Sequence, residues 1–401
     1  MSGIQGICKE PFGELAEITS RWLSMEDGDV GSSVAVTIDG ELVVDLWGGW
    51  MDAERTKPWQ RDTLVNVFST TKAMTSLAAL VLVDRNELDL DAPVCHYWPE
   101  FAQNGKGSIL VKHILSHTSG VSAWDPSVVL EDLYDWDKST SLLSAQAPFW
   151  SPGQGSGYHN LNYGHLTGEV IRRITGKSLG TFFADEIAGP IGADFYIGLP
   201  PELDDRVATV LPPPPHPFNL DELDKDSVLY RTWTSPPCLD PVAFAQHANG
   251  QEWRRAEIGA ANGHGNARSV ACIQAAVANG GSFGDTTLLS QSTIDRIFET
   301  QANGTDLVLM TPLRWGIGYA LPRPDTFAYL PQDAKVCFWG GWGGSMIIVD
   351  VDRRMTFAYM KNKLTPGIIG GPTATELITA TYNCLNEGQA SPTSSSGTAH
   401  V

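Results

Sequence analysis

Apolar positions along the chain alternate between a helical period and a strand period. Residues 11–25 carry apolar side chains at helical spacing, which predicts an N-terminal helix. Two β-branched runs, 34–38 and 42–46, flank the Asp-Gly pair 39–40, which is typical of a two-residue hairpin turn. Residues 72–84 are rich in Ala, Leu, Met and Val. The first part of the chain therefore predicts a helix, a hairpin and a buried helix, in that order.

The middle of the chain has a different pattern. Helical spacing is confined to stretches near 109–116 and 162–176, and prolines cluster at 212–215. No strand period dominates between residues 88 and 240. This segment predicts a mainly helical lobe with long loops.

Strand patterns return in the last third of the chain. An Ala-rich stretch over 267–279 predicts a helix, and residues 373–386 predict another. Between these two helices, four stretches carry the strand period: 314–320, 335–339, 344–350 and 355–361.

This order of elements predicts an antiparallel sheet assembled from both ends of the chain and covered by helices on both faces. The fold class is α+β, with α/β/α layers. We expect residues 1–87 and 241–386 to form a discontinuous sheet lobe and residues 88–240 to form the helical lobe. The Ser/Thr/Gly-rich tail, 387–401, is expected to be disordered.

Composition narrows the function classes. The 401 residues include 27 Lys+Arg and 46 Asp+Glu, a formal charge of −19, which disfavours binding to nucleic acids and to anionic membranes. The N-terminal residues show no signal-peptide pattern and no run reaches 18 apolar residues, so a soluble, cytoplasmic protein is expected. The six scattered cysteines predict reduced thiols. The nine histidines form no ligand motif, and no phosphate loop occurs, so neither a metal nor another cofactor is expected.

The strongest chemical signal is Ser69 with Lys72, where a loop enters the helix predicted over 72–84. Residues three apart share one face of a helix, so the hydroxyl and the amine would be neighbours. The N-terminus of a helix favours an oxyanion beside Ser69 and helps to keep a nearby amine neutral. The alternative is a helix-capping serine followed by a solvated lysine.

Two further stretches accompany this pair. Tyr158 and Asn160 lie on a glycine-rich loop that can present a phenol and a carboxamide to a cleft, and a lowered pKa would let the phenol move a proton. The sequence Trp-Gly-Gly-Trp-Gly-Gly-Ser over 339–345 interrupts the last strands, and strand glycines allow close approach to the backbone. The alternative is that Tyr158 is an ordinary half-buried loop residue and that the glycines of 339–345 form a bulge.

Other candidates are weaker. Ser282 lies in a Gly-x-Ser-x-Gly pattern, but a helix precedes it where a nucleophile elbow needs a strand. His117 is expected to be a hydrogen-bonded structural residue, whereas His159 could face either the cleft or solvent. Trp124, in the helical lobe, is a candidate for a pocket wall.

Together, Ser-x-x-Lys, Tyr-x-Asn and the strand motif resemble the serine β-lactamase and penicillin-binding-protein superfamily. The second motif is similar to that of class C β-lactamases. The third motif is similar to that of family VIII carboxylesterases and of fungal acyltransferases that acylate statin precursors. Further stretches extend the resemblance from about residue 10 to residue 386: 88–94, 114–121, 253–257 and 261–265.

The resemblance implies a β-lactamase/transpeptidase-like fold and a set of roles. Ser69 would be the acylated nucleophile, and Lys72 and Tyr158 would share the proton transfers, with the identity of the base left open. The backbone N–H groups of Ser69 and Trp342 would form the oxyanion hole. Asn160 would position substrate and hold Lys72. Substrate would also contact the segment Trp339, Gly340 and Gly341, where an uncharged indole suits an uncharged ester rather than a β-lactam carboxylate.

The predicted function is therefore a cofactor-independent serine esterase or transesterase. Its partner would be a small-molecule ester or lactone, cleaved through an acyl-Ser69 intermediate that water or an acceptor alcohol resolves. One alternative is a β-lactamase or D-amino peptidase. The other is a catalytically silent binding protein of the same fold.

Overall fold

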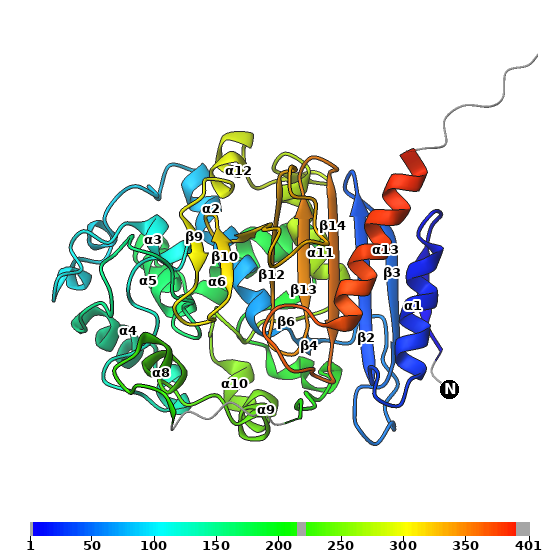
Figure 1. Ribbon diagram of the computed structural model, residues 1–401, viewed down its shortest axis with the longest axis horizontal. Helices are drawn as coiled ribbons and strands as arrows, with labels where there is room; N and C mark the ends of the chain where they lie inside the picture. The colour runs from blue at the N-terminus through cyan, green and yellow to red at the C-terminus, as the bar shows by residue number, and fades with distance from the viewer. Residues whose placement is uncertain (1–2, 215–221, 390–401) are drawn as a thin grey trace, which may run out of the picture.

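The computed structural model describes residues 3–214 and 222–389, and a nine-stranded antiparallel sheet runs through its centre (Figure 1). The strand order is β1-β3-β2-β14-β13-β12-β11-β10-β9. The strands are β1 (Gln5–Cys8), β2 (Gly31–Ile38), β3 (Glu41–Gly49), β9 (Ala302–Thr305), β10 (Pro312–Trp315), β11 (Ala320–Leu321), β12 (Val336–Gly340), β13 (Met346–Asp350) and β14 (Met355–Lys361).

The two ends of the chain meet inside this sheet. Strand β2, from the predicted hairpin, pairs with β14, so that Val36 lies opposite Phe357. The hairpin turn places Asp39 and Gly40 at positive φ, the backbone conformation that an Asp-Gly turn adopts readily. The sheet assembled from both chain ends, and the α+β class with α/β/α layers, are confirmed.

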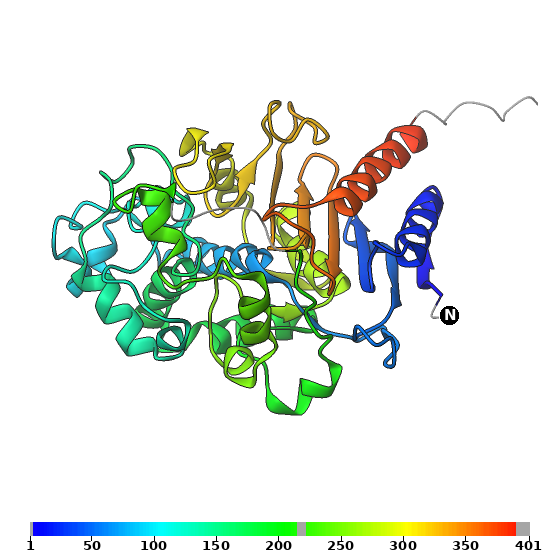
Figure 2. The same cartoon turned by 60° about the horizontal axis from the view of Figure 1, so that its bottom comes forward.

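Helices cover both faces of the sheet. Helices α1 (Gly13–Ser24) and α13 (Pro372–Gln389) lie side by side on one face, and α11 (Ala267–Ala278) covers the other (Figures 1 and 2). Alternate strand residues enter two separate clusters: Ile348 packs toward α1 and α13, while Ile347 packs on the other side. Burial of both faces accounts for the continuous apolar runs of the central strands.

The middle of the chain is helical. Helix α2 (Thr71–Asp84) is almost entirely buried and packs on α5 (Tyr163–Thr175). The other helices are α3 (Val111–Leu115), α4 (Trp136–Ala145), α6 (Leu179–Phe183), α7 (Gly189–Ile191), α8 (Val228–Trp233), α9 (Pro241–Asn249), α10 (Gln251–Arg255) and α12 (Gln291–Ile297). Short strands form two small sheets: β4 (Val65–Asn66), β6 (His264–Gly265) and β5 (Phe195–Tyr196), and the pair β7 (Ser282–Phe283) and β8 (Thr286–Thr287). The lobe boundaries predicted above stay a prediction.

Three local expectations need correction. The strand expected over 314–320 is divided into β10 and β11, because a turn closed by a 2.9 Å bond from Gly316 N–H to Tyr319 O separates them. Edge strands β1 and β9 were not predicted. Helix α13 continues to Gln389, so 387–389 belong to the helix, and the rest of the expected tail lies outside the described residues.

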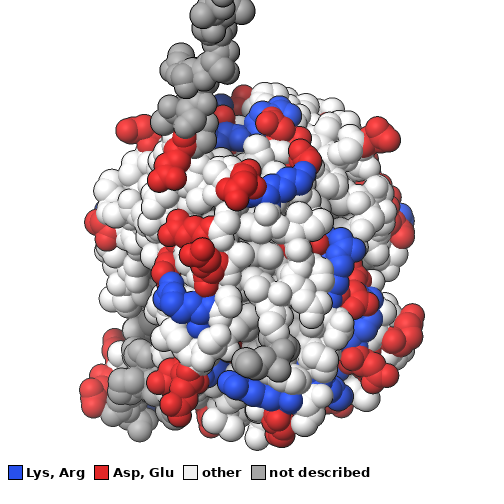
Figure 3. Space-filling model, turned by 90° about the vertical axis from the view of Figure 1, so that its right-hand side faces the viewer, with Lys and Arg blue, Asp and Glu red and all other residues white. Residues whose placement is uncertain are grey.

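The surface carries both signs of charge. On the face that includes α1 and α13, acidic and basic side chains are interspersed (Figure 3), and Arg21 of α1 pairs with Glu376 of α13. Within the described ranges, none of the helices has the length and apolar character needed to cross a membrane. All six cysteines are free thiols.

Candidate active site

Ser69 lies in a tight turn that leads directly into α2. The turn is a 3-10 segment, Phe68–Thr70, and Phe68 has φ of +46°, a strained conformation for a side-chain-bearing residue. One turn later, Lys72 Nζ lies 3.1 Å from Ser69 Oγ. The structure thus brings together the hydroxyl and the amine that the Ser-x-x-Lys spacing predicted to be neighbours.

Lys72 is buried, and none of the described carboxylates pairs with it. Its Nζ donates to the backbone oxygens of Asn160 at 2.7 Å and Ala260 at 2.9 Å. Burial disfavours the ammonium form and lowers the pKa of Lys72 well below its ordinary value. A neutral amine has two N–H groups for these two carbonyls, which leaves its lone pair for the hydroxyl of Ser69.

Tyr158 lies against the same pair of residues. Lys72 Nζ is 4.6 Å from the centre of the Tyr158 ring, and the phenol lies beside Ser69. Trp339 Nε1 donates to the phenol oxygen at 3.3 Å. Burial raises the pKa of Tyr158 above its ordinary value. The phenol is therefore held protonated, in contrast to the lowered pKa considered from sequence.

The backbone N–H groups of Ser69 and Trp342 have no acceptor in the described part of the chain. Ser345 ties their two segments together, because its Oγ donates to Val67 O at 2.7 Å and lies 3.0 Å from Thr70 Oγ1. A Cβ at Gly341 would lie 2.2 Å from Val67 O, so only glycine allows this approach. The geometry suits an oxyanion hole.

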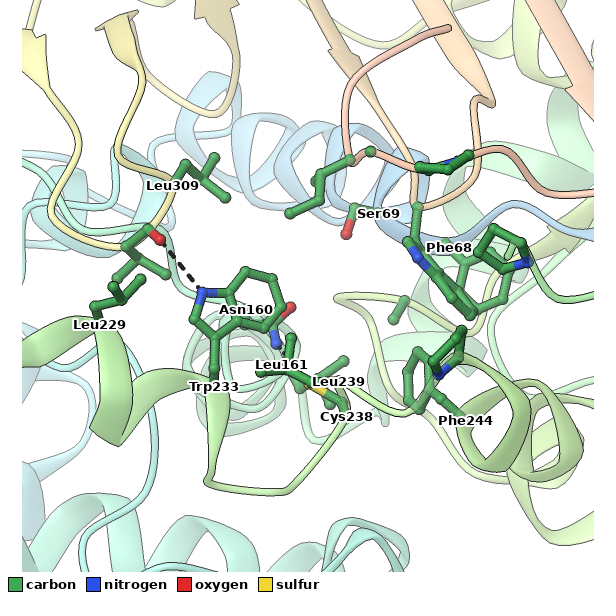
Figure 4. A pocket seen from close by; sticks show the side chains of 18 of the residues that line it. Phe68, Ser69, Asn160, Leu161, Leu229, Trp233, Cys238, Leu239, Phe244 and Leu309 are labelled. Atoms are coloured by element: carbon green, nitrogen blue, oxygen red, sulfur yellow. Dashed lines mark hydrogen bonds between the residues drawn. The ribbon is translucent and has the colours of Figure 1, made fainter. Parts of the chain in front are cut away.

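A cavity of about 340 Å³ opens in front of Ser69. Figure 4 shows Phe68 and Phe244 on one side of Ser69 and Leu229, Trp233 and Leu309 on the other. The Phe68 and Phe244 rings also contact Trp342, with ring centres 5.1 and 5.3 Å from its indole. None of the described residues that line the cavity is charged. The cavity therefore suits an apolar, uncharged molecule.

The remaining predicted site residues lie in different places. Asn160 lines the cavity, but its backbone oxygen, not its carboxamide, contacts Lys72, and Nδ2 donates to Cys238 Sγ at 3.2 Å. Trp339 is buried behind Tyr158 and, with Gly340 and Gly341, is not among the residues that line the cavity. These three residues therefore lie behind the site and do not form its wall.

Trp124 requires a correction. Its indole is buried, donates to Ser139 O at 3.1 Å and packs edge-on against His165, so it belongs to the core and does not line the cavity. A single large aromatic in a sequence does not distinguish a core position from a pocket position. Several of the actual wall residues, among them Trp233, Phe244 and Leu309, come from segments that carry no motif.

The histidines and Ser282 take structural positions. His117 Nδ1 accepts a hydrogen bond from the backbone N–H of His159 at 3.0 Å, in agreement with a hydrogen-bonded structural role. His159 faces neither cleft nor solvent: it is buried, with Nε2 2.6 Å from Ser119 Oγ. Ser282 pairs with Thr287 across the β7–β8 hairpin. No cluster of potential metal ligands occurs in residues 3–214 and 222–389.

The helix–sheet–helix layers and the buried Ser, Lys and Tyr side chains together define a serine hydrolase of the β-lactamase/transpeptidase fold. A family model described as Beta-lactamase matches residues 24–375, and the chain belongs to this family.

Individual relatives agree with this assignment. The chain is 32% identical over 345 residues to the esterase/beta-lactamase LipL of Mycobacterium tuberculosis, covering 84% of this chain and 78% of that protein. A crystal structure of a family VIII carboxylesterase is 40% identical, with a TM-score of 0.88, covering 95% of this chain and 99% of that one. A penicillin-binding-protein homologue from Caulobacter crescentus is 36% identical, with a TM-score of 0.87 and coverage of 95% and 99%.

Proposed function

We propose that the protein is a serine esterase that cleaves small, uncharged esters or lactones through an acyl-Ser69 intermediate. The observation that carries the proposal is the position of Ser69 Oγ. It lies 3.1 Å from an amine whose charged form burial disfavours, at an apolar cavity whose described lining bears no charge.

Acylation would begin with Lys72. As Ser69 Oγ attacks the ester carbonyl carbon, its proton passes to the lone pair of Lys72 Nζ. The carbonyl oxygen becomes an oxyanion that accepts the N–H groups of Ser69 and Trp342, and each such donor contributes about 3 kcal/mol to transition-state stabilisation.

Tyr158 would complete this half of the reaction. When the tetrahedral intermediate collapses, the bond to the leaving oxygen breaks and that oxygen takes the phenol proton. The Lys72 ammonium returns a proton to Tyr158, so the site is ready for the second half. Water, or an alcohol in the cavity, then attacks the acyl-Ser69 ester by the same steps in reverse.

The first test is Ser69→Ala. We expect the substitution to abolish both turnover of a short-chain aryl ester and the intact-mass adduct formed by a serine-reactive phosphonate. Ser282→Ala serves as the matched control, because Ser282 lies in a hairpin outside the cavity, and it should retain both signals. Normal turnover by the Ser69→Ala protein would refute the proposal. The absence of both turnover and adduct in the wild-type protein would instead favour the silent binding protein.

Acyl transfer is a second candidate. The cavity is apolar on both sides of Ser69 and so favours an alcohol over water as the second nucleophile. Adding a competing alcohol to the ester reaction and measuring the ratio of transester to free acid would separate transfer from hydrolysis. Nitrocefin turnover at a rate comparable to ester turnover would favour the β-lactamase alternative, for which the described lining offers no cationic partner.

A further inference from the structure

Asp306 is a buried carboxylate without an ionic partner. It follows β9 directly, is completely inaccessible to solvent and forms no ion pair with any residue in the described ranges. Its Oδ1 accepts three backbone N–H groups, each at 3.0 Å, from Tyr158, Val308 and Leu309. Its Oδ2 accepts Trp315 Nε1 at 3.2 Å. Burial of such a charge is tolerated only when hydrogen bonds replace its hydration.

The three backbone donors belong to two different parts of the site. Tyr158 is the phenol beside Ser69, whereas Val308 and Leu309 form part of the cavity wall. Another hydrogen bond joins the same segments, because Leu307 N–H donates to Ser156 O at 2.8 Å. A single side chain therefore fixes the phenol-bearing loop relative to a wall of the cavity.

The fourth hydrogen bond, from Trp315, links Asp306 to the Tyr158 phenol through packed aromatic rings. The Trp315 ring lies parallel to the Tyr158 ring, with an interplanar angle of 9° and ring centres 6.3 Å apart. The Trp315 ring also packs at 4.7 Å against Trp339, the indole that donates to the phenol oxygen. Asp306 thus holds the backbone of Tyr158 and, through Trp315, one face of the aromatic cluster around its hydroxyl.

We propose that Asp306 is a positioning residue that aims the Tyr158 phenol at the leaving oxygen of an ester whose alcohol lies along Val308 and Leu309. The inference rests on the proposed function, in which Tyr158 protonates the leaving group. A carboxylate is needed because it is acceptor-only: an amide would turn two N–H donors toward either the three backbone N–H groups or the indole N–H.

The test compares two esters of one acid with leaving groups of similar shape and different basicity: phenyl butyrate and 4-nitrophenyl butyrate. For Asp306→Asn, we expect kcat/KM to fall by about 30-fold for the phenyl ester and by about 3-fold for the nitrophenyl ester, because the less basic phenolate leaves with little need of a proton. The ratio kcat/KM reports acylation alone and excludes the shared deacylation step.

Two further variants distinguish a loss of phenol positioning from a general loss of structure. In Asp306→Asn/Trp315→Phe, the amide no longer faces an indole N–H, so kcat/KM for the phenyl ester should recover at least several-fold relative to Asp306→Asn. Leu309→Ala alters the wall and should reduce kcat/KM equally for both esters.

An equal loss for the two esters in Asp306→Asn, without rescue by Trp315→Phe, would overturn the inference and leave Asp306 as a purely structural residue. That outcome is distinct from failure of the proposed function, which would appear as turnover by the Ser69→Ala protein.

Discussion

Two buried lysines differ in whether a carboxylate pairs with them. Lys72 Nζ contacts a hydroxyl and two carbonyl oxygens, and no carboxylate is within ion-pair distance in the described structure. Lys361, on β14 behind the loop at Gly344, pairs with Asp29 at 3.2 Å, and both of these side chains are only 3% exposed. Tyr359 also donates to Asp29.

The difference shows how one residue type serves two purposes. Burial with no counterion makes the charged form of Lys72 costly, which yields an amine able to accept a proton. Burial with a counterion makes the charged pair part of the structure, since removing either partner leaves the other uncompensated. Substitutions around Lys72 are therefore expected to change mainly the activity, and substitutions around Lys361 mainly the free energy of unfolding.

The largest effect is expected from Lys72→Met, which keeps the length of the side chain and removes the amine. Steady-state turnover of the aryl ester should fall by at least about 10³-fold, because the other titratable group beside Ser69, the Tyr158 phenol, has a raised pKa and is a poor base.

The same variant should change how stability depends on pH. The folded pKa of Lys72 is lowered, so between that folded pKa and 10.5 the unfolded chain binds a proton that the folded chain does not. The free energy of unfolding of the wild-type protein should therefore rise with pH up to about 10.5 through this group. Urea unfolding at several pH values should show this contribution in the wild-type protein and not in Lys72→Met. An identical pH dependence in both would contradict a neutral Lys72.

The next effect is on stability. Asp29→Asn leaves the Lys361 ammonium buried without its counterion, which should lower the free energy of unfolding by about 3–5 kcal/mol. Asp39→Asn is the matched control, because Asp39 pairs with Arg354 on the surface and its loss should cost at most about 1 kcal/mol. Chemical denaturation measures both. Equal losses would mean that the buried pair contributes no more than an exposed one.

The smallest effect is expected from a substitution that gives Lys72 a counterion, as Lys361 already has. Burial raises the pKa of Cys238 to about 12, so this neighbour of Lys72 is a neutral thiol at ordinary pH. Cys238→Asp would supply a counterion and raise the pKa of Lys72 by about 1–3. The acid limb of the kcat/KM profile should then move to higher pH, with about tenfold lower activity at pH 7. Cys238→Asn, which is uncharged, should leave the acid limb in place; a shift in both variants would exclude the electrostatic explanation.

The parts of the molecule that could be predicted from sequence are those determined by local spacing. The Asp-Gly turn, the helix that follows Ser69 and the three-residue separation of Ser69 from Lys72 all depend on neighbours in the chain. Strand β1 was missed because it is a short edge strand with mostly exposed residues, so it lacks an apolar period.

The features that could not be predicted depend on distant contacts. Asp306 carries no motif, since its partners are mostly backbone N–H groups that only the folded chain brings to it. Trp124 was misplaced because burial in a core and exposure in a pocket favour the same residue type. The raised pKa of Tyr158 likewise follows from complete burial, which sequence does not reveal.

The sheet built from both chain ends also sets the order in which the active site can be made during synthesis. Ser69, Lys72 and Tyr158 leave the ribosome early, but Trp339 and Trp342 follow more than 170 residues later and β14, the partner of β2, comes later still. Because β2 has no partner on that side until then, a nascent chain that ends before Trp339 has the proposed nucleophile but only part of the proposed oxyanion hole. Hydrolytic activity would thus begin only after the segment that carries Trp342 and β14 has been translated.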